Sequence, residues 1–178
     1  MRVERNDDVL HITLDRPHRG NAVTAQLRDE LTAALSLAVV DDSIRRVVLN
    51  GAGPSFSTGG DLDEFGSRSD PATAHVVRLA RSPARLIHRL ADRLEVSIHG
   101  YTLGGGIEMA AFAGTVIAAP GTQIGLPEIR IGLIPGAGGT VSLTRRIGRQ
   151  RTTALAFSGS YLDAETALAW GLVDQIIE

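Results

Sequence analysis

Short apolar runs alternate along this chain with longer segments whose apolar positions recur at the helical period. Residues 9–15 alternate apolar with polar side chains and are rich in β-branched residues, which predicts a strand that ends at Arg16-Pro17. Thr24 then stands where the N-cap of a helix is expected. The apolar positions of this helix follow the helical period: Leu27, Leu31, Ala34, Leu35 and Ala38.

The rest of the chain continues this alternation. Strands are predicted at 47–49, 95–98, 115–119 and 172–177. Helical periodicity covers 72–94, where Pro83 implies a kink or two abutting helices, and it returns at 103–113, 137–147, 150–157 and 163–170. Because strands and helices alternate, we expect an α/β fold. The length of 178 residues fits one domain, so we treat residues 1–178 as a single domain.

Composition excludes several classes of chemistry. The chain has no Cys and no Lys, and all 18 basic residues are Arg. This excludes disulfides, thiolate nucleophiles, Schiff-base lysines and the phosphate-binding loop that ends in Gly-Lys-Ser/Thr. A net charge of −2 gives no broad positive field, so we expect neither nucleic acid nor membrane as a partner. The N-terminus is charged and no apolar run could span a bilayer, so we expect a cytoplasmic protein.

Glycines mark the segments where chemistry is expected. They gather in residues 56–62, 100–108 and 132–140, and none of these has the Gly-x-Gly-x-x-Gly pattern of a dinucleotide site. In the second segment a strand leads through Gly104-Gly105-Gly106 into a helix that is apolar on every side except at Glu108. Bare N–H groups at its first turn suit an oxyanion. Alternatively, the glycines only permit close packing and Glu108 reaches solvent.

A second isolated carboxylate favours the catalytic interpretation. Glu128 lies in an apolar, turn-like segment. Two isolated Glu side chains in apolar surroundings are expected to have raised pKa values, which suits them to acid–base catalysis. Gly59-Gly60 precedes Asp61 to Glu64, a capping box of the Asp-x-x-Glu kind, so a second short helix would direct its N–H groups at the same oxygen. The third segment, with Gly136, Gly138 and Gly139, either lines a pocket or makes a tight turn.

These spaced motifs resemble the crotonase, or enoyl-CoA hydratase/isomerase, superfamily over essentially the whole chain. The motifs that carry the resemblance are Ile12-Thr13-Leu14-Asp15-Arg16-Pro17 with Asn21-Ala22, Gly51-Ala52-Gly53, Phe56 to Leu62, Gly100-Tyr101-Thr102-Leu103-Gly104-Gly105-Gly106, Leu126-Pro127-Glu128, and Gly132 to Thr140. The resemblance implies a crotonase-like spiral of ββα units and an acyl-CoA thioester as substrate. It implies no separate cofactor, because coenzyme A is part of the substrate, and it implies a homo-oligomer, a trimer or a dimer of trimers.

The resemblance also implies roles for individual residues. The N–H groups of Gly60 and Gly105 would form an oxyanion hole. Glu108 would orient and deprotonate the water that attacks the β-carbon of the acyl group, and Glu128 would protonate the α-carbon. Contacts to the coenzyme A part are expected from Arg19, Ala22, Thr58, Asp61 and Leu62, and contacts to the acyl group from Leu103, Pro127 and Gly136. The five His show no metal-ligand spacing, so no metal site is expected.

Members of this superfamily generally continue into a C-terminal helical segment that covers the active site and supplies basic contacts to coenzyme A. The sequence ends after its last predicted strand, so we expect the full segment to be missing and Arg to hold the phosphates. The sequence thus predicts an enoyl-CoA hydratase, a lyase of fatty acid metabolism. Two alternatives stay open: an enoyl-CoA isomerase or other acyl-CoA chemistry on the same fold, and a non-catalytic acyl-CoA-binding or partner protein.

Overall fold

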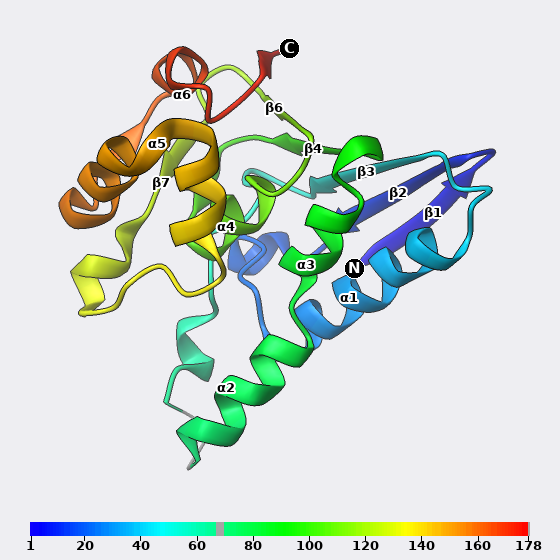
Figure 1. Cartoon of the computed structure of the whole chain (residues 1–178), viewed down its shortest axis with the longest axis horizontal. Coiled ribbons are helices and arrows are strands. Elements are labelled where there is room, and N and C mark those ends of the chain that lie inside the picture. Colours follow the sequence, from blue (N-terminus) through cyan, green and yellow to red (C-terminus); the bar gives the residue numbers. More distant parts are fainter. Residues whose placement is uncertain (67–69, 178) are drawn as a thin grey trace.

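The computed structural model describes residues 1–66 and 70–177, which form a large and a small β-sheet with helices packed around them (Figure 1). The strand order in the large sheet is β1 (Arg2–Asn6), β2 (Val9–Leu14), β3 (Arg46–Gly51), β4 (Leu94–Ile98), β6 (Thr115–Ala118) and β9 (Gln175–Ile176). β1 runs antiparallel to β2, and the later strands of this sheet pair in parallel. The small sheet joins β5 (Tyr101–Leu103), β7 (Gln123–Gly125) and β8 (Tyr161–Leu162).

The helices surround these sheets. In the described part of the chain they are α1 (Ala25–Val40), α2 (Pro71–Ala80), α3 (Pro83–Arg89), α4 (Gly105–Ala110), α5 (Gly139–Ser158) and α6 (Ala164–Trp170). α1 packs against α3, α4 packs against α5, and α2 projects away from both sheets (Figure 1). Within residues 1–66 and 70–177, no helix combines the length and the apolar character needed to cross a membrane.

Two successive turns of the chain repeat one strand–strand–helix unit. The first runs from β4 through β5 into α4, and the second runs from β6 through β7 towards α5. Each turn adds one strand to the large sheet and one to the small sheet, as the parallel pairs Val96↔Val116 and Thr102↔Ile124 show. This arrangement confirms the predicted α/β class and the crotonase-like spiral of ββα units.

The strongly periodic segments fold as predicted. Thr24 caps α1, because its side-chain oxygen accepts a hydrogen bond from the Leu27 N–H at 3.1 Å. All five apolar positions predicted to face inward on this helix are buried. Pro83 separates two abutting helices, α2 and α3. The strands predicted at 9–15, 47–49, 95–98 and 115–119 are β2, β3, β4 and β6.

The short elements differ from the prediction. The helix expected over 103–113 is only α4, Gly105–Ala110, because Leu103 belongs to the small-sheet strand β5. The two helices expected at 137–147 and 150–157 are confirmed: they are the two parts of α5, which meet at a kink where Gly148 has a non-helical backbone with φ 78°. The sequence does not predict β1, β5, β7 or β8, and β9 covers only two residues of the strand expected at 172–177. β1 has every residue exposed, so its sequence carries no alternation.

Asn21 ties three stretches of backbone together near the start of α1. It is fully buried in a left-handed conformation with φ 53°. Its side-chain oxygen accepts from the Arg16 N–H at 2.7 Å, and its amide group donates to the carbonyls of Ala52 at 2.9 Å and Ser55 at 2.8 Å. These bonds hold the loop after β3, which leads on to Gly59-Gly60.

Replacing Asn21 with Ala should destabilise the fold by about 2–4 kcal/mol. The change leaves two carbonyls and one N–H without their partner, and Ala tolerates the left-handed backbone less well than Asn. Urea unfolding followed by circular dichroism measures the free energy of unfolding. A loss below about 0.5 kcal/mol, the usual scatter of exposed substitutions, would contradict this account of the loop.

Candidate active site

Glu108 is buried between α4 and the start of α5. Its exposed fraction is 1%, and its Oε2 accepts hydrogen bonds from the main-chain N–H groups of Ala137 and Gly139, both at 2.7 Å. The Ser142 hydroxyl donates to the Glu108 carbonyl at 2.8 Å. The alternative in which Glu108 reaches solvent is therefore wrong, because the carboxylate caps the beginning of the facing helix.

Glycine at position 139 makes this approach possible. A β-carbon added to Gly139 would lie 2.6 Å from Glu108 Cγ, which is shorter than any real contact. Gly138 precedes it with φ 113° and lies against the Phe112 ring. The third glycine-rich segment thus makes a tight turn that fits around Glu108, while Gly136 stays exposed.

Glu128 approaches the same place from the other side. It lies in a 3-10 helix, Pro127–Ile131, and a β-carbon added to Gly104 would lie 2.6 Å from Glu128 Oε1. Its Oε2 is buried and has no hydrogen-bond partner among residues 1–66 and 70–177. A buried carboxylate oxygen without a donor favours the protonated form of the group.

Burial raises the pKa values of both carboxyl groups. Burial raises the pKa of Glu108 to about 7, assisted by the negative charge of Glu128 and opposed by the N–H groups of Gly139 and Ala137. Burial also raises the pKa of Glu128. Two interacting carboxyl groups of this kind titrate as a pair rather than independently.

Two main-chain amides lie next to each other close to this pair. The loop at Gly59-Gly60 packs on the turn at 103–105: a β-carbon added to Gly59 would lie 3.3 Å from the Gly105 nitrogen, and one added to Gly105 would lie 3.8 Å from the Gly60 nitrogen. In the described parts of the chain, neither the Gly60 N–H nor the Gly105 N–H has a hydrogen-bond acceptor. The structure therefore brings together the two donors predicted from the sequence; their role as an oxyanion hole stays a prediction.

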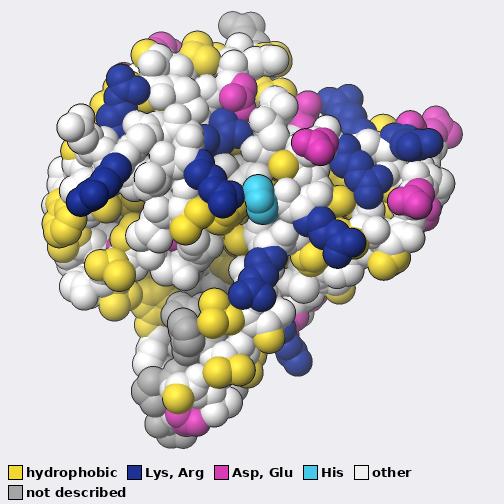
Figure 2. Space-filling view, viewed as in Figure 1, with side chains coloured by type: hydrophobic (Ala, Val, Ile, Leu, Met, Phe, Trp, Pro, Cys, Tyr) yellow, Lys and Arg dark blue, Asp and Glu magenta, His cyan; other side chains and the backbone are white. Residues whose placement is uncertain are grey.

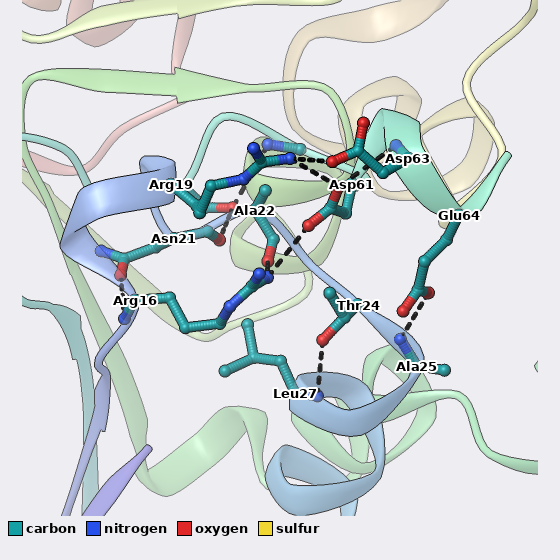
Figure 3. Close-up of polar contacts among 12 residues, drawn as sticks. Arg16, Arg19, Asn21, Ala22, Thr24, Ala25, Leu27, Asp61, Asp63 and Glu64 are labelled. Atoms are coloured by element: carbon teal, nitrogen blue, oxygen red, sulfur yellow. Dashed lines mark hydrogen bonds and ion pairs between the residues drawn. The ribbon is translucent and has the colours of Figure 1, made fainter.

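An ion-pair cluster adjoins Gly60. We use this name for Arg16, Arg19, Asp61 and Asp63 (Figure 3). Arg16 Nη1 lies 3.1 Å from Asp61 Oδ2, and Arg19 Nη2 lies 3.4 Å from Asp61 Oδ1 and also binds Asp63. Burial of Asp61 is outweighed by the Asp63 N–H and the two guanidinium groups, which hold the pKa of Asp61 below its usual value.

The predicted capping box at Asp61 to Glu64 is wrong in its second half. Asp61 does cap the short 3-10 helix Leu62–Glu64, since its side chain accepts from the Asp63 N–H. The Glu64 carboxylate accepts instead from the Ala25 N–H at 2.8 Å, and the Asp61 N–H donates to the Val23 carbonyl. α1 begins beside this turn, so Glu64 satisfies one of its free N–H groups (Figure 3).

The residues expected to contact the substrate form two groups. Segments 19–23 and 58–61 lie side by side, joined by the Thr58 N–H to Gly20 carbonyl bond and the Val23↔Gly60 bridge. In this group Thr58 and Leu62 are exposed and Ala22 is buried. Near the carboxyl pair, Leu103 is buried, Pro127 is half-buried and Gly136 is exposed. Substrate contact by any of these eight residues stays a prediction.

Sequence reasoning missed several neighbours of the site. They are Ala137, whose N–H binds Glu108, Arg16 and Asp63 of the ion-pair cluster, and Phe65, whose ring edge lies 2.9 Å from a β-carbon added to Gly60. The glycines around Ala137 could have indicated this contact, because glycine is typical of places where another part of the chain comes close to the backbone. The ion pairs and the Phe65 contact carry no local signal, since their partners are set by the tertiary fold.

Replacing Glu108 with Gln should stabilise the protein at alkaline pH. Gln keeps an oxygen for the two N–H donors but never ionises. The folded-state pKa of Glu108, about 7, lies above its ordinary value of 4.5, so the native protein loses stability as pH rises from about 4.5 through 7. We expect the free energy of unfolding of the variant to exceed that of the native protein by about 1–3 kcal/mol at pH 8 and to differ little from it at pH 4. Denaturant titrations at the two pH values measure this difference in stability, with the exposed Glu165→Gln variant as control. A gain in stability from Glu108→Gln that is equal at pH 4 and pH 8 would contradict the raised pKa of Glu108.

Comparisons with known proteins show the family of this chain. The sequence model of the family described as enoyl-CoA hydratase/isomerase matches residues 4–178. The 2,3-dehydroadipyl-CoA hydratase of Escherichia coli is 36% identical over 98% of this chain and 68% of its own length. The mevalonyl-coenzyme A hydratase of Beauveria bassiana is 35% identical over 95% of this chain and 63% of its own length. This chain therefore spans about two thirds of the length of the curated relatives that it matches.

Solved structures lead to the same family. An enoyl-CoA hydratase from Thermoplasma volcanium superposes over 99% of this chain and 71% of its own, with a TM-score of 0.87 and 37% identity. An enoyl-CoA hydratase from Bacillus anthracis covers 99% of this chain and 69% of its own, with a TM-score of 0.90 and 32% identity. Its sequence match and its ββα spiral show that the chain belongs to the enoyl-CoA hydratase/isomerase family of the crotonase superfamily.

Proposed function

We propose that this protein is an enoyl-CoA hydratase, which adds water across the α,β double bond of an acyl-CoA thioester. The observation that carries the proposal is the meeting of two Glu carboxyl groups with raised pKa values beside two main-chain N–H groups that have no acceptor among residues 1–66 and 70–177. Relatives that are named as hydratases support it. Hydration requires one group that accepts a proton and one that donates a proton, and the pair supplies both when it holds a single proton.

The proposed reaction starts from the form of the pair in which Glu108 is ionised and Glu128 carries the proton. In this form the Glu108 Oε2 accepts two N–H groups and Glu108 acts as the base, while Glu128 acts as the acid. Glu108 takes a proton from water as the water oxygen bonds to the β-carbon. The electron pair of the double bond then takes the proton of Glu128 at the α-carbon. The products are a 3-hydroxyacyl thioester, a protonated Glu108 and an ionised Glu128, and proton exchange between the two resets the site.

Negative charge on the thioester oxygen has to be stabilised while the β-carbon is attacked. The N–H groups of Gly60 and Gly105 are adjacent and free of acceptors in the described chain, so a carbonyl oxygen placed between them would receive two hydrogen bonds. In other enzymes one such donor contributes roughly 3–4 kcal/mol to transition-state stabilisation. Both donors belong to the main chain, so no side chain is needed to hold the carbonyl.

Isomerisation on the same site is the second candidate. One relative, from Mycosarcoma maydis, is named an isomerase/hydratase, and shifting a double bond needs one carboxyl group that moves a proton between two carbons. Hydration is preferred here because the second carboxyl group is present and directed at the same place as the first. Product analysis separates the two, since hydration adds the mass of one water and isomerisation adds none.

Assembly and compartment belong to the same proposal. We propose a homo-oligomer, a trimer or a dimer of trimers, in the cytoplasm. Sedimentation velocity of the purified chain tests the assembly directly, and a monomer at micromolar concentration would contradict it.

Replacing Glu128 with Gln should reduce hydration of a short enoyl-CoA, such as crotonyl-CoA, by about 10²- to 10⁴-fold in kcat. The amide preserves the shape of the side chain but cannot transfer a proton. The rate is followed as the loss of the ultraviolet absorbance of the conjugated thioester. Glu165→Gln, which changes an exposed carboxylate on α6, is the matched control and should hydrate at the native rate. Near-normal turnover by the Glu128→Gln protein would overturn the proposed chemistry.

A further inference from the structure

The ion-pair cluster beside Gly60 balances its own charge. Two guanidinium groups, Arg16 and Arg19, face two carboxylates, Asp61 and Asp63 (Figure 3). Arg16 also donates to the Ala22 carbonyl at 2.8 Å, which fixes it to the backbone. The cluster therefore presents little net charge, although the neighbouring amides are the proposed binding point of an anionic substrate.

The two carboxylates of the cluster differ in burial. The Asp61 side chain is only 5% exposed, accepts from the Asp63 N–H and binds both Arg side chains, so it is part of the packed structure. The Asp63 side chain is 77% exposed and binds Arg19. Asp63 is thus not needed to complete the packing, and its effect is exerted through Arg19.

Arg19 is the exposed cation of this group. Its side chain is 46% exposed, against 27% for Arg16, and the bonds to Asp61 and Asp63 hold it in place (Figure 3). Phosphate groups are bound in proteins by Arg or Lys, and this chain contains no Lys. On the face shown in Figure 2, the Arg side chains are dispersed rather than gathered into one basic field. The pairing of Arg19 with Asp61 and Asp63 therefore bears on how strongly Arg19 can hold a phosphate group.

We propose that Asp63 competes with the phosphate groups of coenzyme A for Arg19 and thereby weakens the binding of the substrate's nucleotide part. The inference rests on the proposed function, because it takes a coenzyme A thioester as the ligand. Binding exchanges the Arg19–Asp63 ion pair for an Arg19–phosphate ion pair. Only the difference in free energy between these two ion pairs therefore contributes to affinity. Asp63 is in this sense a specificity-determining residue for the phosphate-bearing part of the substrate.

The test compares Asp63→Asn with the native protein on two ligands, free coenzyme A and pantetheine, which lacks the phosphates. Calorimetric titration at about 10 mM ionic strength, where exposed charges are weakly screened, measures both affinities without turnover. We expect Asp63→Asn to bind coenzyme A about two- to five-fold more tightly, the usual size of an exposed ion pair, and to bind pantetheine as the native protein does. Equal affinity of the two proteins for coenzyme A would overturn the proposal, and so would a matching gain for pantetheine.

Two further variants separate the ion pair from a general change in charge. Asp41→Asn also removes a carboxylate paired with an Arg, Arg5 at 2.8 Å, but at the opposite end of α1, about 24 Å along a 16-residue helix. It should leave coenzyme A affinity unchanged. In an Arg19→Ala background, Asp63→Asn should no longer increase coenzyme A affinity. If Asp63→Asn still increases coenzyme A affinity in the Arg19→Ala background, or if Asp41→Asn increases it equally, the effect is a general change in charge. Either result would overturn the proposed competition between Asp63 and phosphate for Arg19.

Failure of this inference and failure of the proposed function can be told apart. The hydration of crotonyl-pantetheine, which has no phosphate, reports the chemistry at Glu108 and Glu128 alone. If that reaction proceeds and Asp63→Asn has no effect on coenzyme A binding, the hydratase stands and the competition is wrong. If neither crotonyl-CoA nor crotonyl-pantetheine is hydrated, the proposed function is wrong, and the calorimetric comparison still decides whether Asp63 competes with phosphates.

Discussion

The burial of the Glu108 carboxylate is the constraint on which the rest of the site depends. A buried carboxylate must be hydrogen-bonded or neutral, and Glu108 meets this requirement by accepting the N–H groups of Ala137 and Gly139. The bonds fix where the chain enters α5, and a side chain at position 139 would collide with Glu108. Glu128 then closes over Gly104, where an added β-carbon would lie 2.6 Å from Glu128 Oε1. Gly104 and Gly139 are thus the two glycines that let the carboxyl groups come close together inside the protein.

Carboxylates on the two sides of the Gly60 and Gly105 amides have opposite environments. Asp61 is nearly buried, yet two guanidinium groups keep it ionised and lower its pKa. Glu108 is nearly buried and accepts only main-chain N–H groups within the described chain, and burial raises its pKa to about 7. The same chemical group is therefore structural in one place and able to exchange protons near neutral pH in the other. The proposed reaction uses this difference. Protons are transferred at the Glu108–Glu128 pair, and the thioester carbonyl is bound by the main-chain N–H groups of Gly60 and Gly105.

Local patterns in the sequence predict the long elements and the positions of the two Glu residues, but not how the short elements pair. α1 could be predicted because its cap and its apolar face are both local properties of residues 24–38. β5, β7 and β8 have two or three residues each, too few for alternation to be recognised, and they exist because they pair with one another. The Glu64 bond to Ala25 and the Arg19 bond to Asp61 join positions about forty residues apart, so no local pattern could indicate them. The glycines signalled close approach, but which side chain approaches each of them is set by the fold.

The most direct test of the central claim is to follow isotopes from water into product. Crotonyl-CoA incubated with the 178-residue chain in deuterated, ¹⁸O-labelled water is analysed by mass spectrometry and proton magnetic resonance. The account predicts a 3-hydroxyacyl thioester with one ¹⁸O at the β-carbon and one deuterium at the α-carbon. Deuterium exchange without added oxygen, or unchanged crotonyl-CoA, would contradict the claim that the Glu108–Glu128 pair adds water to an enoyl thioester.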